Sequence, residues 1–394
     1  MAPAPSPNGA GLTDLPTGPL GPLADRVRRE LDERGLPAAQ FAVAREGELL
    51  AFETIGAVPA GASTRFVIWS CTKAVVASVV WQLVDEGLVD YAKPVATYLP
   101  TFATNGKEHV TVEQVLLHTA GFPTAPMGPS YWSTSEGRRA AFARWRLNWE
   151  PGTRYEYHQL AAGWVLAELI SAASGDADYR DVIHRRVCEP LGLRSLRVGV
   201  PEHDQGDVAP VVMVGAPATD DDYHAAGWRP LPPPETPPGV AATAMNAPAA
   251  LATGIPGGGG VSTAADVALF YQALLHENGA GLWSRAVLDD ATGVVRNAFP
   301  DTGRWGEPAS RTRGVVVRSD DEPYASLRHH FGPATSPRTF GHDGAGGQIA
   351  WADPDSGLSF CFLTSGYDAN RVRELLRNQD LARLAVECAT AATA

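Results

Sequence analysis

The sequence predicts an α/β fold of the α+β type, in which an antiparallel sheet is flanked by helices and interrupted by an inserted, mainly helical region. Three observations support this prediction: two short apolar runs that flank Glu46-Gly47, several strand-like segments in the last third of the chain, and apolar segments with helical spacing between them. With 394 residues, 44% of them hydrophobic, the chain can bury a large core as one composite domain or two.

The N-terminal part predicts an arm, a helix and a hairpin. Residues 1–20 contain no Lys or Arg and no apolar run of signal-peptide length, so we expect a disordered arm and no export signal. A helix is predicted near residues 23–33. The apolar runs at 40–44 and 49–54, separated by Glu46-Gly47, predict a β-hairpin.

A buried helix is predicted from Ser70 to about residue 86, because apolar residues recur there at helical spacing. Residues i and i+3 share a helix face, so the Lys73 amine should reach the Ser70 hydroxyl. The chain has only three lysines, and a lysine, unlike an arginine, can be made neutral by burial and neighbouring positive charge. This pair is a candidate activated nucleophile. The alternative is that Ser70 is an ordinary N-cap and Lys73 a solvated first-turn residue.

The middle of the chain, about 111–245, is predicted to hold helices and long loops. A Pro-Gly-Thr turn at 151–153 leads to Tyr157 and Gln159 at the start of an apolar helix over 160–171. Residues 201–256 are rich in proline and glycine, and include the run 230–234. We interpret this segment as a lid or a substrate wall, with plain disorder as the alternative.

Strands return in the C-terminal third. Residues 313–317, 347–350 and 358–364 are predicted as strands of the sheet, and residues 371–387 as a closing amphipathic helix. The glycine-rich run from Phe340 to Gly347 precedes the second of these strands.

Three motifs occur in a fixed order: Ser70-x-x-Lys73, Tyr157-x-Gln159 and His342-x-Gly344. Together they resemble the active-site motifs of the serine β-lactamase and penicillin-binding-protein superfamily. Segments such as 115–121 and 258–264 look like landmarks of its class C β-lactamase-like branch, and the surroundings of Tyr157 and His342 look most like family VIII carboxylesterases and related acyltransferases. The resemblance covers about residues 20–385 and implies the β-lactamase/transpeptidase-like fold.

The resemblance also implies roles for individual residues. Ser70 would be the nucleophile, Lys73 its base or proton relay, and Tyr157 the group that exchanges protons with the leaving group and the acyl acceptor. The backbone N–H groups of Ser70 and Ala345 would form the oxyanion hole. Gln159, His342 and Gly344 would contact the substrate. Gln159 stands in place of the usual asparagine, and His342 stands where penicillin-binding enzymes carry lysine, which suggests less need for a fixed cation there.

Other polar residues near these motifs have simpler interpretations. Tyr155 is an alternative catalytic tyrosine, but alignment on the Pro-Gly-Thr turn favours Tyr157. We interpret His118 and His158 as structural residues, and Cys71 as a small apolar filler in the helix.

The resemblance and the sequence pattern together suggest three units: an arm at 1–20, a sheet domain from 21–95 with 256–394, and a helical domain at 96–255. A net charge of −12 argues against nucleic acid or anionic membrane as a partner. No segment has the length of a transmembrane helix. Four scattered cysteines without metal-type spacing, in a chain without an export signal, predict a cytoplasmic protein with no metal and no cofactor.

We therefore predict a serine acyl-enzyme hydrolase that acts on an ester or amide, like a carboxylesterase. The alternative is an acyltransferase that moves an acyl group from an ester or thioester to an alcohol or amine in small-molecule biosynthesis. A β-lactamase or D-alanyl-D-alanine peptidase ranks third. The expected partners are a small-molecule acyl substrate and, for transfer, an amine or alcohol acceptor.

Overall fold

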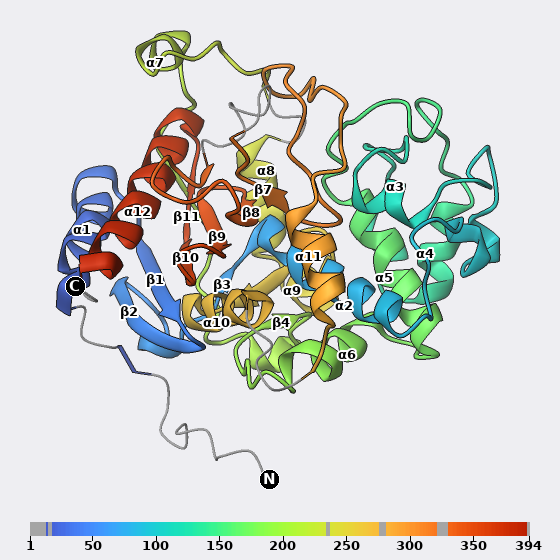
Figure 1. Cartoon of the computed structure of the whole chain (residues 1–394), viewed down its shortest axis with the longest axis horizontal. Helices are drawn as coiled ribbons and strands as arrows, with labels where there is room; N and C mark the ends of the chain where they lie inside the picture. Colours follow the sequence, from blue (N-terminus) through green and yellow to red (C-terminus); the bar gives the residue numbers. More distant parts are fainter. Residues whose placement is uncertain (1–12, 15–17, 234–236, 276–280, 321–329, 392–394) are drawn as a thin grey trace.

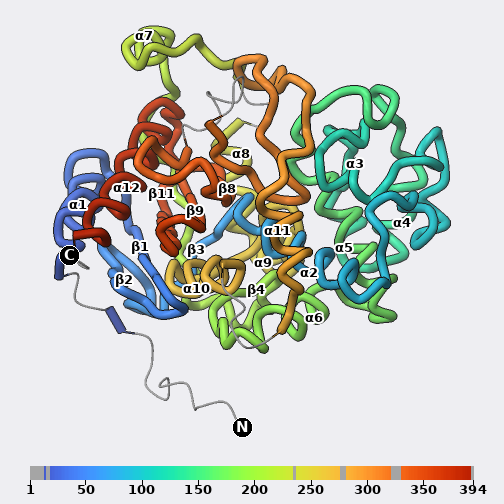
Figure 2. The backbone as a smooth tube through the Cα atoms, viewed as in Figure 1, coloured from blue at the N-terminus to red at the C-terminus, as the bar shows by residue number. Residues whose placement is uncertain are grey.

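A six-stranded antiparallel sheet joins the two ends of the chain in the computed structural model, which describes residues 13–14, 18–233, 237–275, 281–320 and 330–391. The predicted architecture is confirmed. In spatial order the strands are β2 (Glu48–Gly56), β1 (Ala38–Arg45), β10 (Leu358–Thr364), β9 (Gln348–Asp353), β8 (Phe340–Gly344) and β7 (Val316–Val317). Figure 2 shows the N-terminal hairpin in blue beside the C-terminal strands in red.

The predicted hairpin forms around the two residues between its strands. Glu46 and Gly47 both have positive φ, 55° and 81°. Two such residues in succession match the twist of the flanking strands, and they set the register in which Arg45 pairs with Glu48.

The C-terminal strands differ in two places from the prediction. The segment predicted at 313–317 is a strand only at Val316–Val317, because the chain turns tightly before it, with Gly314 at φ 127°. Conversely, Phe340–Gly344 is itself a strand. Glycines are uncommon in strands, so the sequence pattern does not mark this one. Gly341 is needed here because a Cβ at this position would lie 2.2 Å from the Ala350 carbonyl oxygen on β9.

Helices cover both faces of this sheet (Figure 1). On one face α1 (Gly21–Arg34) and α12 (Arg371–Ala391) pack over alternate residues of β1, β9 and β10, such as Phe41, Trp351 and Phe360. The opposite residues of the same strands join the larger core with α10 (Ala264–Leu275) and α2 (Thr72–Asp85). The period of two in the strands therefore fills two apolar layers.

The middle of the chain is mainly helical and packs against α2. Its helices are α3 (Val112–Leu116), α4 (Ser135–Phe142), α5 (Ala161–Ser174), α6 (Tyr179–Ile183), α7 (Asp220–Ala225), α8 (Pro238–Met245) and α9 (Pro248–Thr253); α11 (Arg285–Gly293) follows α10. A small sheet, β3 (Phe66–Val67), β6 (Gly260–Ser262) and β4 (Arg197–Val198), leads into α2.

The proline-rich segment 201–256 contains regular structure in its described part. Besides α7, α8 and α9 it holds β5 (Val212–Val214), which pairs in parallel with β11 (Gly366–Asp368). The alternative of plain disorder is therefore wrong for these residues, whereas its role as a lid or wall stays a prediction. Residues 234–236 lie outside the described residues, as does most of the predicted arm; Gly18–Leu20 form a short 3₁₀ turn before α1. The three-unit division also stays a prediction.

Candidate active site

Ser70 lies at the start of α2, where the chain leaves β3 through a strained turn. Trp69 has φ 48°, in the left-handed region that a bulky residue rarely adopts, and Trp69–Cys71 form a 3₁₀ turn that continues into the helix. The Thr72 hydroxyl fixes this turn, donating to the Trp69 carbonyl at 2.6 Å and accepting from the Gly260 N–H at 3.0 Å. The turn leaves Ser70 half-buried, with its N–H at a helix start that lacks intrahelical partners.

Lys73 is buried beneath Ser70, with 8% of its surface exposed. Its Nζ lies 3.1 Å from Ser70 Oγ, 2.7 Å from the Gln159 carbonyl oxygen and 2.5 Å from the Gly257 carbonyl oxygen. Burial and, after it, the charge of Arg311 together lower the pKa of Lys73 to about 7, against the opposing effect of Asp343. A neutral amine keeps two N–H groups for the two carbonyls, so its lone pair is left for the Ser70 hydroxyl.

Two glycines allow the carbonyls to converge on Lys73. Gly163 on α5 and Gly257 lie backbone against backbone: a Cβ on Gly163 would lie 2.6 Å from the Gly257 nitrogen, and a Cβ on Gly257 would lie 2.8 Å from the Gln159 oxygen. Any larger residue at either position would separate the two segments.

Tyr157 completes the group around Lys73. The Lys73 Nζ lies 4.8 Å from the centroid of the tyrosine ring. Burial raises the pKa of Tyr157 to about 12, against the opposing effect of Arg311. Tyr155, the alternative, is instead buried against Ala309 and accepts a 3.4 Å hydrogen bond from Arg311. Tyr157 is therefore the tyrosine whose ring lies beside Lys73, and its catalytic role stays a prediction.

Two histidines hold the Tyr157 loop in place. His158 accepts from the Phe122 N–H at 3.1 Å through Nε2 and donates to the Glu156 carbonyl at 2.6 Å through Nδ1, which fixes a neutral ring. Its own backbone N–H donates to His118 Nδ1 at 3.3 Å, and the His118 ring packs 4.8 Å from that of Tyr157. Both histidines act on the backbone, as the sequence suggested.

The turn from β8 to β9 lies against the residues that precede Ser70. A Cβ on Gly344 would lie 2.8 Å from the Ile68 oxygen and 3.1 Å from Trp69 Cβ, so only glycine permits this approach. Ala345 follows at once and is half-buried, one residue from this contact with the segment that precedes Ser70. The oxyanion hole formed by the Ser70 and Ala345 N–H groups stays a prediction.

Comparison with known proteins identifies the family. Residues 23–384 match the family model described as Beta-lactamase. The chain belongs to the Beta-lactamase family.

Several relatives of this family have been named for their activity. The chain is 30% identical over 332 residues to the esterase/beta-lactamase LipL of Mycobacterium tuberculosis, covering 78% of this chain and 71% of LipL. It is 30% identical over 225 residues to the esterase EstB of Burkholderia gladioli, covering 46% and 54%. The chain is thus an enzyme of the β-lactamase-like serine hydrolase superfamily.

Solved structures agree with this assignment. A family VIII carboxylesterase superposes with a TM-score of 0.76 at 26% identity, covering 96% of this chain and 99% of that one. A penicillin-binding-protein homologue from Caulobacter crescentus gives 0.75 at 26% identity, with the same coverage.

His342 and Gln159, both predicted to contact the substrate, differ in exposure: the first side chain is buried and the second is exposed. The His342 side chain is 1% exposed and lies behind Tyr157, with ring centroids 6.2 Å apart. The Gln159 side chain is exposed beside the site, while its carbonyl holds Lys73. Cys71 is buried and its Sγ lies 3.2 Å from the His342 carbonyl oxygen, consistent with a filler.

Arg311 is a site residue that the sequence motifs do not reveal. Its guanidinium donates to His342 Nε2 at 2.9 Å and lies 5.0 Å from the centroid of the Tyr157 ring. A fixed cation is therefore present, although His342 replaces the lysine of penicillin-binding enzymes. It arrives from the loop after α11, far from any of the three motifs, so no local signal marks it.

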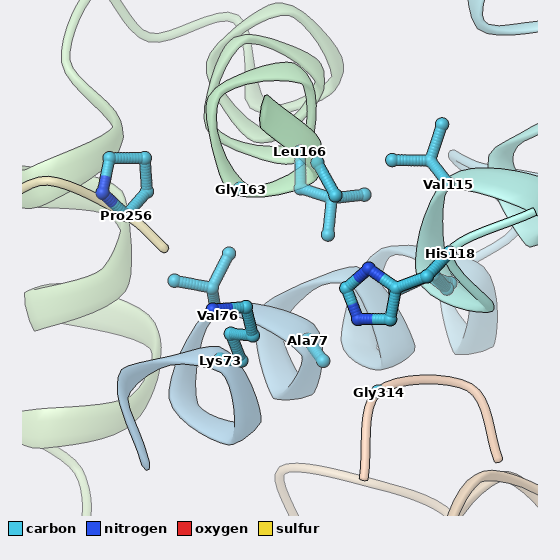
Figure 3. A pocket seen from close by; sticks show the side chains of 11 residues that line it. Lys73, Val76, Ala77, Val115, His118, Gly163, Leu166, Pro256 and Gly314 are labelled. Atoms are coloured by element: carbon cyan, nitrogen blue, oxygen red, sulfur yellow. The ribbon is translucent and has the colours of Figure 1, made fainter. Parts of the chain in front are cut away.

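A small cavity lies on the inner side of Lys73 (Figure 3). Its volume is about 20 Å³, and Lys73 and His118 are the only side chains of its lining with polar groups. Lys73, Val76 and Ala77 enter it from α2, and Leu166 from α5. These apolar surroundings explain why burial is the main cause of the low pKa of Lys73.

Two features are absent from the described residues. Within them no group of three or more His, Cys, Asp or Glu side chains is arranged to hold a metal ion. No helix in that part of the chain is both long enough and apolar enough to cross a membrane.

Proposed function

We propose that the protein is a serine carboxylesterase that hydrolyses a small-molecule ester through an acyl-enzyme on Ser70. The observation that carries this proposal is the pairing of Ser70 with a buried lysine whose two N–H groups are engaged by backbone carbonyls. At neutral pH a large fraction of Lys73 is neutral, because burial brings its pKa to about 7, whereas Tyr157 with a pKa of about 12 stays protonated. Lys73 is thus the better base for the first proton transfer.

Acylation then proceeds in two steps. Ser70 Oγ attacks the ester carbonyl carbon while its proton passes to Lys73 Nζ, and the new oxyanion accepts hydrogen bonds from the Ser70 and Ala345 N–H groups. The bond to the alcohol oxygen breaks next. Tyr157 donates its proton to that oxygen and takes one back from the Lys73 ammonium, which leaves both groups in their starting states.

Deacylation reverses the roles with water as the acceptor. Water loses a proton to the Tyr157 and Lys73 pair as its oxygen attacks the acyl carbon, and Ser70 recovers a proton as the acid leaves. An alcohol or amine in the place of water would give acyl transfer. Two relatives are named as esterases and one solved structure is a carboxylesterase, which supports an ester as the acyl donor and water as the acceptor.

The test compares two identical substitutions on one helix. Ser70→Ala should reduce kcat/KM for p-nitrophenyl acetate or butyrate by at least about 10³-fold, because the nucleophile is absent. Ser78→Ala removes a buried hydroxyl two turns further along α2, which donates only to the Val75 carbonyl, and should retain the activity. Near wild-type turnover by a folded Ser70→Ala protein would refute the mechanism. A panel with added alcohols and amines, read as transferred product against free acid, would reassign the enzyme as an acyltransferase if transfer dominates.

A further inference from the structure

Arg311 has an unusual environment for a buried charge. Its side chain is 6% exposed, and it contacts a tyrosine hydroxyl, an imidazole nitrogen and an aromatic ring. Among the described residues no carboxylate lies within ion-pair distance of it. A buried cation without a carboxylate partner is costly to the fold, which favours a function for the charge itself.

The partner of Arg311 fixes its position. An arginine N–H can only donate, so His342 Nε2 must accept, and His342 Nδ1–H then donates to the Asp343 carbonyl at 2.6 Å. This leaves His342 neutral, in agreement with a pKa held well below the ordinary value by burial and by Arg311. The histidine of the His-x-Gly motif therefore orients the arginine instead of carrying a charge itself.

Lys73 lies near enough to Arg311 for the arginine's charge to affect its protonation. Both groups lie within 5.0 Å of the Tyr157 ring centroid, so they are at most about 10 Å apart. Asp343 opposes Arg311, but its carboxylate faces Arg304 and His330, each at 3.6 Å. The titratable and charged groups around Lys73, taken from every element packed on it, are Cys71, His118, Tyr157, Arg311, His342 and Asp343.

We propose that Arg311 is a positioning residue of the active site: its buried charge, oriented by His342, keeps Lys73 in the neutral form and holds the Tyr157 ring against it. The cation near the third motif is thus supplied by another loop, from which it acts on the base instead of on a substrate carboxylate. This inference rests on the proposed roles of Ser70, Lys73 and Tyr157.

The test separates charge from hydrogen bonding. Arg311→Gln keeps an N–H donor for His342 but removes the charge, whereas Arg311→Lys keeps both. Two charges about 10 Å apart in a protein interior of effective dielectric about 20 shift each other's pKa by roughly one unit. The acid limb of kcat/KM for p-nitrophenyl butyrate should therefore move up by about one pH unit in Arg311→Gln and stay in place in Arg311→Lys.

Arg313→Gln is the matched control. This arginine lies two residues away on the same loop and pairs with Glu113 and Asp290, outside the site. Its substitution removes the same charge from the same loop and should leave the limb where it is in the wild type.

The possible outcomes are distinct. An unchanged limb in folded Arg311→Gln would overturn the inference while Ser70 remains essential, so the proposed function would stand. Near wild-type turnover by a folded Ser70→Ala protein would instead refute the proposed function. If Arg311→Gln does not fold, Arg311→Lys decides: activity with the limb in place supports a role for the charge, and a folded but inactive protein contradicts it.

Discussion

Lys73 shows how a single residue acquires its chemistry from its surroundings. Its carbonyl partners accept two hydrogen bonds, its third neighbour is the Ser70 hydroxyl, and the cavity beside it is apolar. Burial, Arg311 and the absence of an adjacent carboxylate partner among the described ion pairs all favour the neutral amine. This is the state in which a lysine can accept a proton at neutral pH.

The pH dependence of the wild-type enzyme follows from this state. The active form of Lys73 is deprotonated, and because its pKa in the folded protein is about 7 instead of 10.5, activity should fall as the pH drops below 7. We expect log kcat/KM for p-nitrophenyl butyrate to rise with unit slope below pH 7 and to level off above it. A limb found only above pH 9, or a flat profile between pH 5.5 and 9, would rule out this role for Lys73.

At this scale the sequence predicted the local pair but not its environment. Ser70 and Lys73 are three residues apart on one helix, so their contact follows from helix geometry alone. Arg311 and the carbonyl of Gly257 reach the same point from loops far along the chain. Their approach depends on tertiary packing, which no spacing in the sequence records.

At the scale of elements, α5 and the loop before β6 can pack closely because each has a glycine, which carries no side chain, at their contact. The contact between Gly163 and Gly257 places two carbonyls on Lys73, one from each segment. β8 is a second case, since Gly341 and Gly344 allow it to lie against β9 and against the turn at Trp69. Glycines are typical of turns, so the sequence pattern placed the strand only after this run and did not include β8.

Gly163→Ala tests the glycine contact. The added methyl would force the Gly257 segment away from α5, so we expect a loss of about 1–3 kcal/mol in the free energy of unfolding and at least a tenfold loss in kcat. Gly293→Ala, at the end of α11, meets nothing within 4 Å and serves as the control. Urea melts and steady-state kinetics measure both. Wild-type kcat in Gly163→Ala would show that the two carbonyls do not depend on this contact.

At the scale of the whole molecule, strands from both ends of the chain form one sheet and carry the site between the sheet and the helical region. β10, in the centre, pairs with β1 from the N-terminus and with β9 from the same C-terminal third. The strand-like runs at both ends of the chain and the family resemblance together predicted this arrangement. The sequence could not predict the helices of segment 201–256, some of whose prolines lie at helix starts, as in α8 and α9, where proline is tolerated.

The central claim is that Ser70 becomes acylated with Lys73 as its base, and covalent trapping tests it most directly. The wild-type enzyme is reacted with a fluorophosphonate at pH 8, and the modified residue is located by peptide mass spectrometry. Lys73→Arg keeps the charge but cannot accept a proton, so its labelling should be slower by about 10²-fold or more. Lys107→Arg is the control, because this second buried lysine donates to Thr104 and Trp145 away from the site.

The account predicts one label per chain, on Ser70, at similar rates in the wild type and Lys107→Arg, and a strongly reduced rate in Lys73→Arg. A label on any other residue, or wild-type labelling of Ser70 in Lys73→Arg, would contradict it.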